Sequence, residues 1–497
     1  MQRPLMRYEK SLRSAANLLN ADFVNEDVMI SGLTHSSQEV EPGDLFLAFP
    51  GAKAHGARFC TDAKTRGALA VLTDSAGAQI VAELANGLPA VVVKDPRRSA
   101  GTLSAWFYDE PIRDIYSVGI TGTNGKTTTT TLLHQIWTAA GRESGLIGTV
   151  ETRIGLDLLK SKRTTPESSD LQALVATMRE RHVRNLAMEV SSHAIALERI
   201  RGSHFAAVAF TNLTQDHLDF HNTMEAYFQA KASLFTFEYA DLAFINIDDP
   251  YGARLAESTE IALCTLSRND PKADWSYVTA HSHLRGNDVS IRGPGGILIE
   301  GLLPLHGEYN LDNSLMAVAL AFESGVDPLE IATILPTLSG AQGRMQPVAL
   351  GQDFGAFVDY AHSPDAVARV LEACRSMTTG KVIAILGCGG DRDSSKRPLM
   401  GKALATGSDI AVFTSDNPRS EDPIKILEQM TQGLAIIQPD QVISDRKTAI
   451  DYAVSQALSG DIVVILGKGH ETGQESAGVT TPFDDRLALA QAIEARW

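Results

Sequence analysis

A glycine-rich turn followed by lysine and threonine constrains the fold of this chain more than any other feature. Residues 122–127 read Gly-Thr-Asn-Gly-Lys-Thr. A β-branched and aromatic run precedes the turn at 115–120, and residues 127–140 carry leucine, isoleucine and tryptophan at helical spacing. A strand, a glycine turn and a helix start in this order place several backbone N–H groups around one anion. The pattern predicts a phosphate-binding loop in which Lys126 reaches the outer phosphates and the Thr127 hydroxyl binds Mg²⁺.

This loop is a shortened form of the eight-residue phosphate-binding motif, because Ile120 stands where the strict pattern has glycine. Isolated glycine-lysine-threonine turns are common and are usually structural. Here the strand before the turn and the helix after it favour nucleotide binding over that simpler interpretation.

Composition and charge narrow the possible functions. The chain has 497 residues, which exceeds one hydrophobic core and suggests about three domains. Its net charge of −16 and pI of about 5.3 argue against nonspecific binding to nucleic acid or to an anionic membrane. No apolar run approaches the roughly 20 residues that span a bilayer, and the N-terminus has no apolar signal-peptide core. We therefore expect a cytoplasmic protein, acting as a monomer, that binds neither nucleic acid nor membrane.

The hydrophobic pattern changes twice along the chain. Short strands precede a charged, proline-bearing segment at 95–98, and strands alternate with helical stretches from residue 115 onward. A second alternating set begins after the glycine-rich segment at 339–344. Alternation of this kind is typical of parallel sheets covered by helices. We predict an α/β protein with three domains: a smaller N-terminal α/β domain over 1–98, a central P-loop domain over 99–340 and a C-terminal Rossmann-like domain over 341–497.

Three polar residues of the predicted central domain each have two interpretations. Glu189 ends a strand, where a carboxylate either binds Mg²⁺ near the phosphates or caps a helix. His217 follows another strand and either binds a metal or forms a hydrogen bond within its loop. Lys231 lies on an apolar helix, where a single lysine is usually a surface side chain with a buried stem. These residues alone do not decide between structure and chemistry.

Four polar turns directly follow apolar strands in the last third of the chain, at 359–365, 387–393, 416–419 and 467–471. Each turn alone has a structural explanation, since Gly, Asn, Asp and Pro are what turns require. Together they bring arginines, histidines and several acids to the carboxyl ends of strands, where ligands gather in open α/β sheets. An arginine can hold a carboxylate at two points, and Glu471 can hold an ammonium group. The four turns therefore predict a site for a small zwitterion.

Six motifs occur in order along essentially the whole chain. They are Thr-Gly-Thr-Asn-Gly-Lys-Thr at 121–127, Met-Glu-Val-Ser-Ser-His at 188–193, Thr-Asn-Leu-Thr-Gln-Asp-His-Leu-Asp at 211–219, Gly-Arg-Met at 343–345, Asp-Tyr-Ala-His-Ser-Pro-Asp at 359–365 and Gly-Lys-Gly-His-Glu at 467–471. Together they closely resemble the motifs of the Mur ligase family. The resemblance implies an ATP-dependent, amide-forming ligase of cytoplasmic peptidoglycan precursor synthesis that works through an acyl-phosphate intermediate.

The string Asp-Asn-Pro-Arg at 416–419 bears on the acceptor amino acid. It resembles the form found in family members that add meso-2,6-diaminopimelate to UDP-N-acetylmuramoyl-L-alanyl-D-glutamate, whereas lysine-adding members lack the arginine. Diaminopimelate has a carboxylate that lysine lacks, and Arg419 can pair with it. The resemblance thus implies three substrates: ATP, the UDP-linked precursor and meso-diaminopimelate.

The same resemblance assigns the central polar residues. Lys231 stands where the family carries a lysine carbamylated by CO₂, a change that turns a cation into an anionic Mg²⁺ ligand. Glu189 and His217 match the other metal ligands of the family, and Thr127 matches the ligand of the nucleotide-bound Mg²⁺. The expected catalytic residues are Lys126, Glu189, His217 and Lys231.

The remaining site residues also follow from the resemblance. Contacts to ATP are expected from Gly122, Thr123, Asn124, Gly125, Lys126, Thr127, Thr128, Asn310, Asn313, Arg344 and Asp359. Contacts to the UDP-linked precursor are expected from Ser37, Lys53, Ala54, Thr164, Thr165, Ser191 and Arg199. Contacts to diaminopimelate are expected from Arg392, Asp416, Asn417, Pro418, Arg419, Gly467 and Glu471.

Two segments depart from the family pattern. The usual Asp-Ser-Arg turn of the N-terminal domain reads Ser-Ser-Gln at 36–38, which affects the uridine contacts. The threonines at 164 and 165 are followed by proline, which affects the shape of their loop.

Other functions share parts of this sequence pattern. A lysine-adding Mur ligase, or a folylpolyglutamate-type or cyanophycin-type ligase, would share the central chemistry and use another acceptor. The arginine at 419 and the N-terminal domain argue against these. A P-loop ATPase or binding regulator that is not a ligase would not need the C-terminal zwitterion site.

Overall fold

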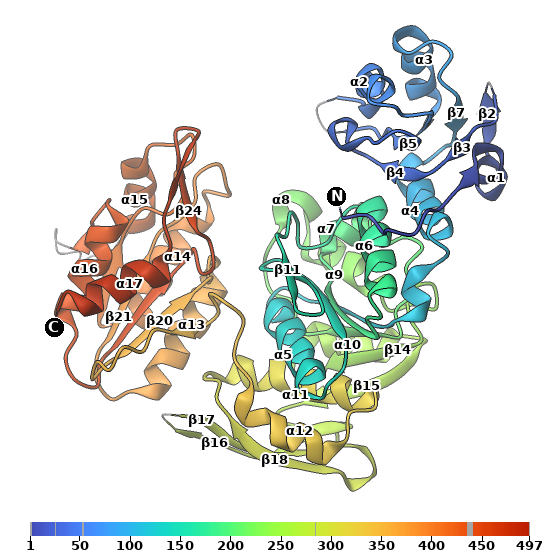
Figure 1. The fold of residues 1–497 in the computed structure, drawn as a ribbon. Coiled ribbons are helices and arrows are strands. Elements are labelled where there is room, and N and C mark those ends of the chain that lie inside the picture. The colour runs from blue at the N-terminus through green and yellow to red at the C-terminus, as the bar shows by residue number, and fades with distance from the viewer. Residues whose placement is uncertain (1, 25, 52–53, 284, 435–440, 497) are drawn as a thin grey trace.

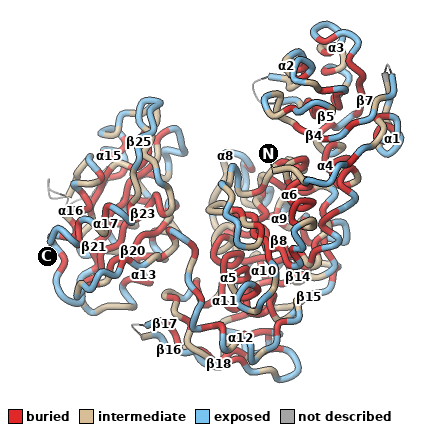
Figure 2. The backbone as a smooth tube through the Cα atoms, in the orientation of Figure 1, coloured by how far each residue is buried: buried red, intermediate tan, exposed pale blue. Residues whose placement is uncertain are grey.

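Among the described residues, three sheets of five or more strands follow one another along the chain in this computed structural model (Figure 1). The structure describes residues 2–24, 26–51, 54–283, 285–434 and 441–496. Buried residues gather on the strands and on the helix faces turned toward them (Figure 2). The predicted α/β class is confirmed by these parallel-rich sheets. The domain boundaries after residues 98 and 340 stay predictions.

The N-terminal region is built on a small sheet. Its described strands lie in the order β2 (Asp22–Val24), β7 (Ala90–Val92), β6 (Ala70–Thr73), β5 (Asp44–Leu47) and β4 (Gly32–Thr34), and only β2 runs antiparallel to its neighbour. The α-helices described in this region are α1 (Leu12–Leu18), α2 (Cys60–Thr65) and α3 (Ser75–Leu84). A short pair, β1 (Lys10–Ser11) with β3 (Met29–Ile30), lies beside it. Helix α4 (Pro96–Phe107) leads to the central region and runs across the predicted boundary after residue 98.

The central sheet has a parallel core with antiparallel strands at both edges. The parallel strands are β9 (Ser144–Ile147), β12 (Asn185–Glu189), β8 (Tyr116–Thr121), β13 (Ala207–Phe210), β14 (Leu242–Asn246), β15 (Ala262–Ser267) and β16 (Trp275–His283), in that order across the sheet. The edges are extended by β10 (Thr152–Ile154) and β11 (Asp157–Leu159) on one side, and by β17 (Gly286–Arg292) and β18 (Leu298–Leu303) on the other. The parallel core was predicted from the sequence, and the antiparallel edges were not.

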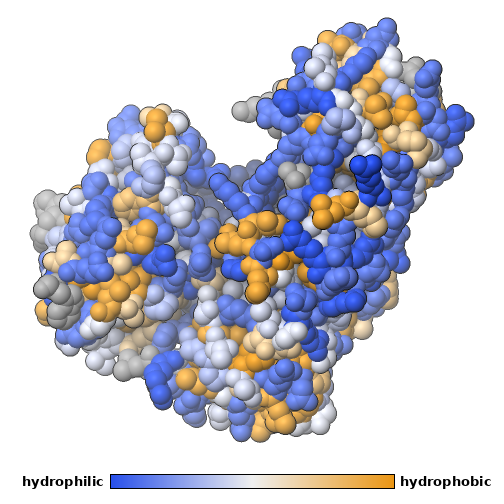
Figure 3. Space-filling model, viewed as in Figure 1, coloured by the Kyte–Doolittle hydropathy of each residue, from blue (hydrophilic) through white to orange (hydrophobic). Residues whose placement is uncertain are grey.

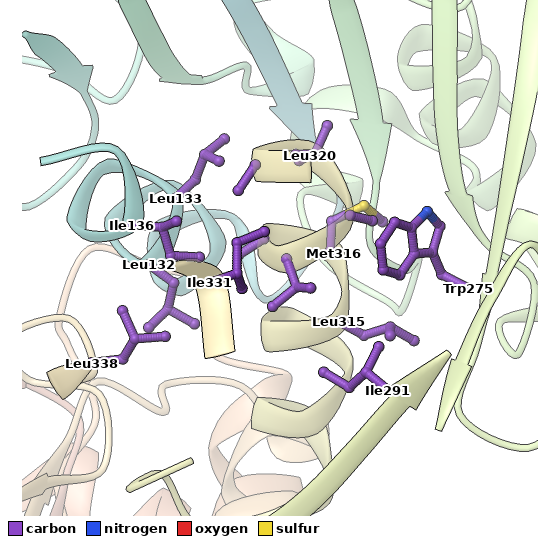
Figure 4. Close-up of a cluster of buried hydrophobic side chains, with 14 of the residues drawn as sticks. Leu132, Leu133, Ile136, Trp275, Ile291, Leu315, Met316, Leu320, Ile331 and Leu338 are labelled. Atoms are coloured by element: carbon purple, nitrogen blue, oxygen red, sulfur yellow. The ribbon is translucent and has the colours of Figure 1, made fainter. Parts of the chain in front are cut away.

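Helices cover both faces of the central sheet. One face carries α5 (Lys126–Ala139), α11 (Glu308–Glu323) and α12 (Pro328–Ile334), and the other carries α6 (Ser168–Glu180), α9 (Met224–Ala232) and α10 (Pro250–Ser258). Figure 4 shows Leu132 and Ile136 of α5 and Leu315 of α11 among the buried side chains of the first of these cores. Burial of each such side chain contributes about 1.5–3 kcal/mol to the free energy of folding. This packing therefore fixes α5, and with it the position of its first residue after the glycine turn. Among the described residues, no helix is both long and apolar enough to cross a membrane.

The C-terminal region has a five-stranded sheet within the part of the chain that the structure describes. The order is β19 (Gln346–Pro347), β20 (Gly355–Asp359), β23 (Ile462–Leu466), β21 (Val382–Leu386) and β22 (Ile410–Phe413), with only β19 antiparallel. Its helices are α13 (Pro364–Met377), α14 (Lys396–Gly407), α15 (Pro423–Thr431), α16 (Arg446–Gln456) and α17 (Asp485–Glu494). A hairpin of β24 (Gly473–Ser476) and β25 (Val479–Pro482) projects beyond the strand ends. Residues of β20, β21 and β23 are almost all buried, because helices cover both faces.

The three regions enclose a recess in the surface. Figure 3 shows this hollow at the top of the molecule, between the C-terminal region and the N-terminal region, above the central region. The short helices α7 (Ser192–Ala196) and α8 (Leu218–His221) lie near it, at the end of the central sheet (Figure 1). The carboxyl ends of the parallel strands carry the predicted site residues, which places those residues toward the neighbouring regions.

Candidate active site

The glycine turn between β8 and α5 is held tightly by its neighbours. Gly122 and Gly125 have φ values of 149° and 89°, which favour glycine. A Cβ atom at Gly122 would lie 1.9 Å from Thr211 Oγ1, and one at Gly125 would lie 2.3 Å from Asn313 Oδ1. The Thr211 hydroxyl also donates a hydrogen bond of 2.6 Å to Asn124 O. Both glycines are therefore required by backbone conformation and by space.

Lys126 opens α5 and folds back over this turn. Its Nζ donates to Gly122 O and to Thr123 O, both at 2.9 Å. Burial lowers the pKa of Lys126, and the nearby carboxylate of Glu189 opposes that shift. Within the part of the chain that the structure describes, the ammonium donates to backbone carbonyls only, so an anion in the loop would provide it with a charged partner.

A pocket of about 260 Å³ opens beside the loop, and its walls come from both the central and the C-terminal regions. Met316 of α11 and Val370 of α13 contribute apolar surface to it. An apolar wall beside a phosphate-binding loop is an arrangement that suits a nucleotide. The predicted residues that line the pocket are Thr123, Asn124, Gly125, Lys126, Thr127, Thr128, Thr164, Glu189, Ser191, His217, Asn313, Arg344 and Asp359.

The C-terminal wall of this pocket carries an arginine and an aspartate. The Arg344 guanidinium lies 4.7 Å from the centroid of the Tyr360 ring, and its buried Nε has no hydrogen-bond partner among the described residues. The Asp359 carboxylate accepts from the N–H groups of Met345 and Ala361, each at 2.7 Å. Burial raises the pKa of Asp359, and Arg344 opposes the shift. Arg344 therefore keeps a donor available for an anionic ligand.

Asn310 lies on α11, one helical turn before Asn313, and does not line the pocket. Its Nδ2 donates to His306 O at 2.8 Å, and its Oδ1 accepts from Asn313 Nδ2 at 3.3 Å. Asn313 also accepts at Oδ1 from the Thr129 hydroxyl of α5 at 3.4 Å. The two amides thus join α11 to the helix that begins at the phosphate loop.

Lys231 lies directly behind the phosphate loop and is 1 % exposed. Its Nζ donates to Gly122 O at 2.8 Å and to Thr121 Oγ1 at 3.4 Å, and it lies 4.8 Å from the centroid of the Tyr227 ring. Burial lowers the pKa of Lys231 well below its ordinary value, and the like charge of Lys126 adds to that shift. The simpler interpretation, a surface lysine with a buried stem, is wrong because the amine itself is buried.

Glu189 and His217 lie on opposite sides of the loop. The buried Glu189 carboxylate accepts from Thr149, at 2.7 Å from its N–H and 3.0 Å from its hydroxyl. His217 has a left-handed φ of 53° and lies in edge contact with His193, with ring centroids 4.7 Å apart. Burial lowers the pKa of His217 to about 4, so its imidazole is neutral at pH 7 and has a lone pair for a ligand.

The structure alone does not identify a metal centre. Within the described ranges, no group of three or more His, Cys, Asp and Glu side chains could hold a metal ion. The pocket nevertheless has the Thr127 hydroxyl and the Glu189 carboxylate on its wall, and hard oxygen donors of this kind suit Mg²⁺. The predicted donor set therefore fits the ion chemically, and its roles stay predictions.

The loops after β22 and β23 meet in the C-terminal region. Asn417 Nδ2 donates to Glu471 Oε2 at 2.7 Å, which joins the two loops. Asp416 and Pro418 flank Asn417, and Asp416 Oδ2 would lie 2.6 Å from a Cβ atom at Gly467. The predicted diaminopimelate residues on these two loops are thus neighbours. Arg392 is exposed on the loop after β21.

Lys468 is a buried cation in this cluster that the sequence reasoning did not single out. Its Nζ lies at hydrogen-bond distance from Asn417 Oδ1 (3.3 Å), Glu471 Oε2 (3.2 Å) and Gly473 O (2.6 Å). An ammonium has three N–H donors, and all three are used here. Lys468 therefore fixes the orientation of Asn417 and Glu471. The sequence signal that could have identified Lys468 was its place in the Gly-Lys-Gly-His-Glu motif.

The predicted precursor residues form two groups. Thr164 and Thr165 lie beside the pocket, where the Thr165 hydroxyl donates to Glu189 O at 2.8 Å and Arg199 Nη1 donates to Thr165 O at 3.4 Å. Ser191 accepts from the Ala194 N–H as the N-cap of α7. Ser37 and Ala54 belong to the N-terminal region, and Lys53 lies outside the described residues.

Comparisons with known proteins agree along the chain. Models described as Mur ligase family catalytic domain, Mur ligase middle domain and Mur ligase glutamate ligase domain match residues 29–108, 120–321 and 343–469. A Streptomyces coelicolor protein named UDP-N-acetylmuramoyl-L-alanyl-D-glutamate–2,6-diaminopimelate ligase is 48 % identical, over 99 % of this chain and 98 % of its own. The chain belongs to the Mur ligase family.

Solved structures show the same fold as this Mur ligase. A structure of UDP-N-acetylmuramoyl-L-alanyl-D-glutamate–2,6-diaminopimelate ligase matches 94 % of this chain and 95 % of its own, with 32 % identity and a TM-score of 0.67. Folylpolyglutamate synthase of Mycobacterium tuberculosis, complexed with ADP, matches 75 % of this chain and 92 % of its own, with 17 % identity and a TM-score of 0.61. The first likeness extends over almost the whole chain and the second over three quarters of it.

An ion pair joins the C-terminal region of this Mur ligase to its central region. Lys396 Nζ donates to Asp216 Oδ1 at 2.8 Å, and the two side chains are 21 % and 15 % exposed. Burial raises the pKa of Asp216, but His217 and Lys396 outweigh burial and hold it below its ordinary value. Sequence reasoning missed both partners, because a contact between regions distant in the sequence has no local pattern.

Proposed function

We propose that this Mur ligase uses ATP to join meso-2,6-diaminopimelate to UDP-N-acetylmuramoyl-L-alanyl-D-glutamate. The relative from Streptomyces coelicolor is named for this reaction and is similar over nearly its full length. The observation that carries the choice of acceptor is that Arg419 and Glu471 lie on adjoining loops, which the hydrogen bond from Asn417 to Glu471 joins. Arg419 would bind the carboxylate that diaminopimelate has and lysine lacks, and Glu471 would hold an ammonium group.

ATP would lie in the pocket with its phosphates on the glycine turn. In the first step, an oxygen of the D-glutamate side-chain carboxylate attacks the γ-phosphorus, the bond to the β-phosphate oxygen breaks and ADP leaves. Lys126 and Arg344 stabilise negative charge as it moves between these oxygens. The buried, unpartnered Nε of Arg344 supports this role.

The second step forms the amide bond. The neutral amino nitrogen of diaminopimelate attacks the acyl carbon, the carbon–oxygen bond to phosphate breaks, and the nitrogen loses a proton. Reacting atoms must approach within about 3–3.5 Å, so the C-terminal region has to bring the amine to the acyl phosphate. The Asn417–Glu471 contact would orient the amine for this approach.

The central polar residues would hold the metal. Thr127, Glu189, His217 and a carbamate on Lys231 are the proposed Mg²⁺ ligands, and Mg²⁺ would neutralise phosphate charge. A lowered pKa favours the neutral form of the Lys231 amine, which is the form that reacts with CO₂. The nitrogen bonds to the CO₂ carbon and releases a proton, which leaves an anionic carbamate.

Replacing Lys231 tests this assignment. Lys231→Ala should reduce turnover at ambient CO₂ by several orders of magnitude, because the metal loses one ligand, and steady-state phosphate release measures it. Lys381→Ala, at an exposed position before β21, is the matched control and should retain wild-type rates. Wild-type turnover in the Lys231 variant would remove this residue from the metal site.

The precursor would bind across the N-terminal and central regions. Ser37 and Ala54 are the proposed contacts to its uridine end, and Thr164, Thr165, Ser191 and Arg199 are the proposed contacts to its peptide end. With ATP and a UDP-linked precursor as substrates, we expect the reaction in the cytoplasm. One chain carries all of these groups, and we expect it to act as a monomer.

The deciding experiment measures phosphate release with ATP, Mg²⁺ and the UDP-linked muramoyl dipeptide, with either meso-diaminopimelate or L-lysine as acceptor. We expect release with diaminopimelate and little with lysine. Equal use of lysine would leave the ligase in place and remove the role of Arg419 in selectivity. Release with neither acceptor would contradict the proposed function.

A further inference from the structure

Three arginines converge on one carboxylate where the N-terminal and central regions meet. Arg163 Nη1 donates to Glu167 Oε1 at 2.6 Å, and Arg199 Nε lies 3.0 Å from the same oxygen. Arg97 Nη1, at the start of α4, lies 3.5 Å from Glu167 Oε2. Among the described residues, no second carboxylate lies within 4.0 Å of these guanidinium groups. The cluster of Arg97, Arg163, Arg199 and Glu167, here called the arginine cluster, is left with two unbalanced positive charges.

The arginine cluster lies between the two halves of the proposed precursor site. Arg163 immediately precedes Thr164, and Arg199 Nη1 donates to Thr165 O at 3.4 Å. On the other side, the Arg97 guanidinium lies 5.0 Å from the centroid of the Phe49 ring, which follows β5 in the N-terminal region. Ala54, one of the proposed uridine contacts, stands five positions after Phe49 in the sequence. A precursor that extends from one half to the other would pass this cluster.

The charges of the cluster call for an anionic partner. Like charges held this close repel each other, and burial together with Arg163 and Arg97 lowers the pKa of Arg199. Glu167 has two oxygens for three guanidinium groups, which together have fifteen N–H donors. Planar guanidinium forks match phosphate and carboxylate oxygens at two points. A bound oxyanion would balance the charge and accept from the donors that Glu167 leaves free.

We infer that Arg97 and Arg163, together with Arg199, bind an anionic group of the UDP-linked precursor. The identity of this ligand rests on the proposed function. Two groups of the precursor have the required chemistry, namely the diphosphate and the α-carboxylate of D-glutamate. Both present anionic oxygens to the same guanidinium forks.

The test compares Arg97→Gln and Arg163→Gln with wild type in direct binding by calorimetry. The probes are UDP, which has the diphosphate and no peptide, and UDP-N-acetylmuramoyl-L-alanyl-D-glutamate. Arg181→Gln is the matched control, because Arg181 lies in the same region and pairs with Asp157 away from the cluster. Thermal unfolding of each variant separates a loss of binding from a loss of fold.

We expect each of the two variants to weaken precursor binding about tenfold, which is the size of one lost charge-assisted hydrogen bond. We also expect a weaker dependence of binding on salt, while the KM for ATP stays at the wild-type value. Equal weakening of UDP binding would assign the diphosphate, and weakening of precursor binding alone would assign the carboxylate. Either result supports the arginine cluster as an anion site.

Wild-type affinity for both probes in both folded variants would overturn the inference. The arginines would then serve only to hold Glu167 at the start of α6. Failure of the proposed function would look different: wild type would show no phosphate release with either acceptor. Because UDP binding is measured without turnover, the two failures are distinguishable.

Discussion

Arg419 is the residue on which the choice of acceptor depends, and its backbone is unusually constrained. Its φ is 51°, in the left-handed region. Its N–H donates to Glu475 O at 3.0 Å, its carbonyl accepts from the Ala477 N–H at 2.6 Å, and its Nη1 donates to Gly390 O at 2.7 Å. An arginine held from three sides is preorganised, so less side-chain entropy is lost when a carboxylate binds.

Arg419→Ala should therefore raise the KM for diaminopimelate by about 10-fold to 100-fold, the range expected for hydrogen bonds to a charged group. The KM for ATP should not change, and the low rate with L-lysine should also stay the same. Initial rates at varied acceptor concentration measure the effect. A raised KM for ATP would contradict the assignment of Arg419 to the diaminopimelate site.

Lys468 acts on the same substrate through its neighbours. Lys468→Met removes the ammonium that orients Asn417 and Glu471, so the KM for diaminopimelate should rise about tenfold. Lys468→Arg should not restore it, because the guanidinium does not fit three acceptors arranged around one nitrogen. The comparison is with Lys381→Met, an exposed position before β21. A variant that lowers kcat at an unchanged KM would contradict a positioning role.

Sequence reasoning and structure differ most clearly for single buried cations. Lys126 was predicted from the strand and helix around it, since both signals are local. Lys231 resembled a surface lysine by helical spacing, and only family resemblance singled it out. Lys468 was missed because its role depends on Asn417, which belongs to another loop, although its other two acceptors, Glu471 and Gly473, follow it closely in the sequence. Local pattern locates a site residue when its partners are local.

The two strands that precede the acceptor loops are joined at their ends by Arg446, which also forms a buried ion pair. Arg446 of α16 donates to Asp485 of α17 at 2.7 and 2.6 Å, and both side chains are fully buried. The same guanidinium donates to Ser415 O after β22 at 3.1 Å and to Leu466 O, at the end of β23, at 2.9 Å. One side chain thus fixes the distance between the loops that start at these residues.

Arg446→Met should lower the free energy of unfolding by about 3–5 kcal/mol, because it leaves the Asp485 carboxylate buried and unpaired. Lys447→Met, the next residue, breaks an exposed pair with Asp451 and should change stability by about 0–1 kcal/mol. Denaturant unfolding of both variants checks the difference. Equal stability of the two variants would show that the buried pair is not required.

At the level of elements, the sequence predicted the parallel strands better than the edges. The run at 382–386 reads Val-Ile-Ala-Ile-Leu and is a fully buried strand, because continuous apolar runs bounded by turns have few other solutions. Strands β16, β17 and β18 alternate or mix polar residues. Strand β16 pairs parallel with β15, and β17 and β18 then extend the central sheet antiparallel. Their pairing depends on register with distant segments, which local periodicity does not specify.

The ion pair between Lys396 and Asp216 matters for the whole molecule, because it joins two regions with separate cores. Lys396→Gln should lower kcat several-fold, since the C-terminal region would spend less time docked beside His217. Added salt should reduce wild-type activity toward that of the variant. Lys402→Gln, exposed on the same helix, is the control. Unchanged kcat in the Lys396 variant would show that docking does not depend on this contact.

The nucleotide loop and the acceptor loops belong to different sheets. The glycine turn follows β8 of the central sheet, whereas residues 416–419 and 467–476 follow β22 and β23 of the C-terminal sheet and meet at the β24–β25 hairpin. Substitutions that reshape the hairpin do not touch the packing around Gly122 and Gly125. Acceptor preference can therefore diverge among descendants of one ancestral enzyme while its use of ATP is inherited intact. A graft of these two short segments is the smallest exchange that would transfer the acceptor preference.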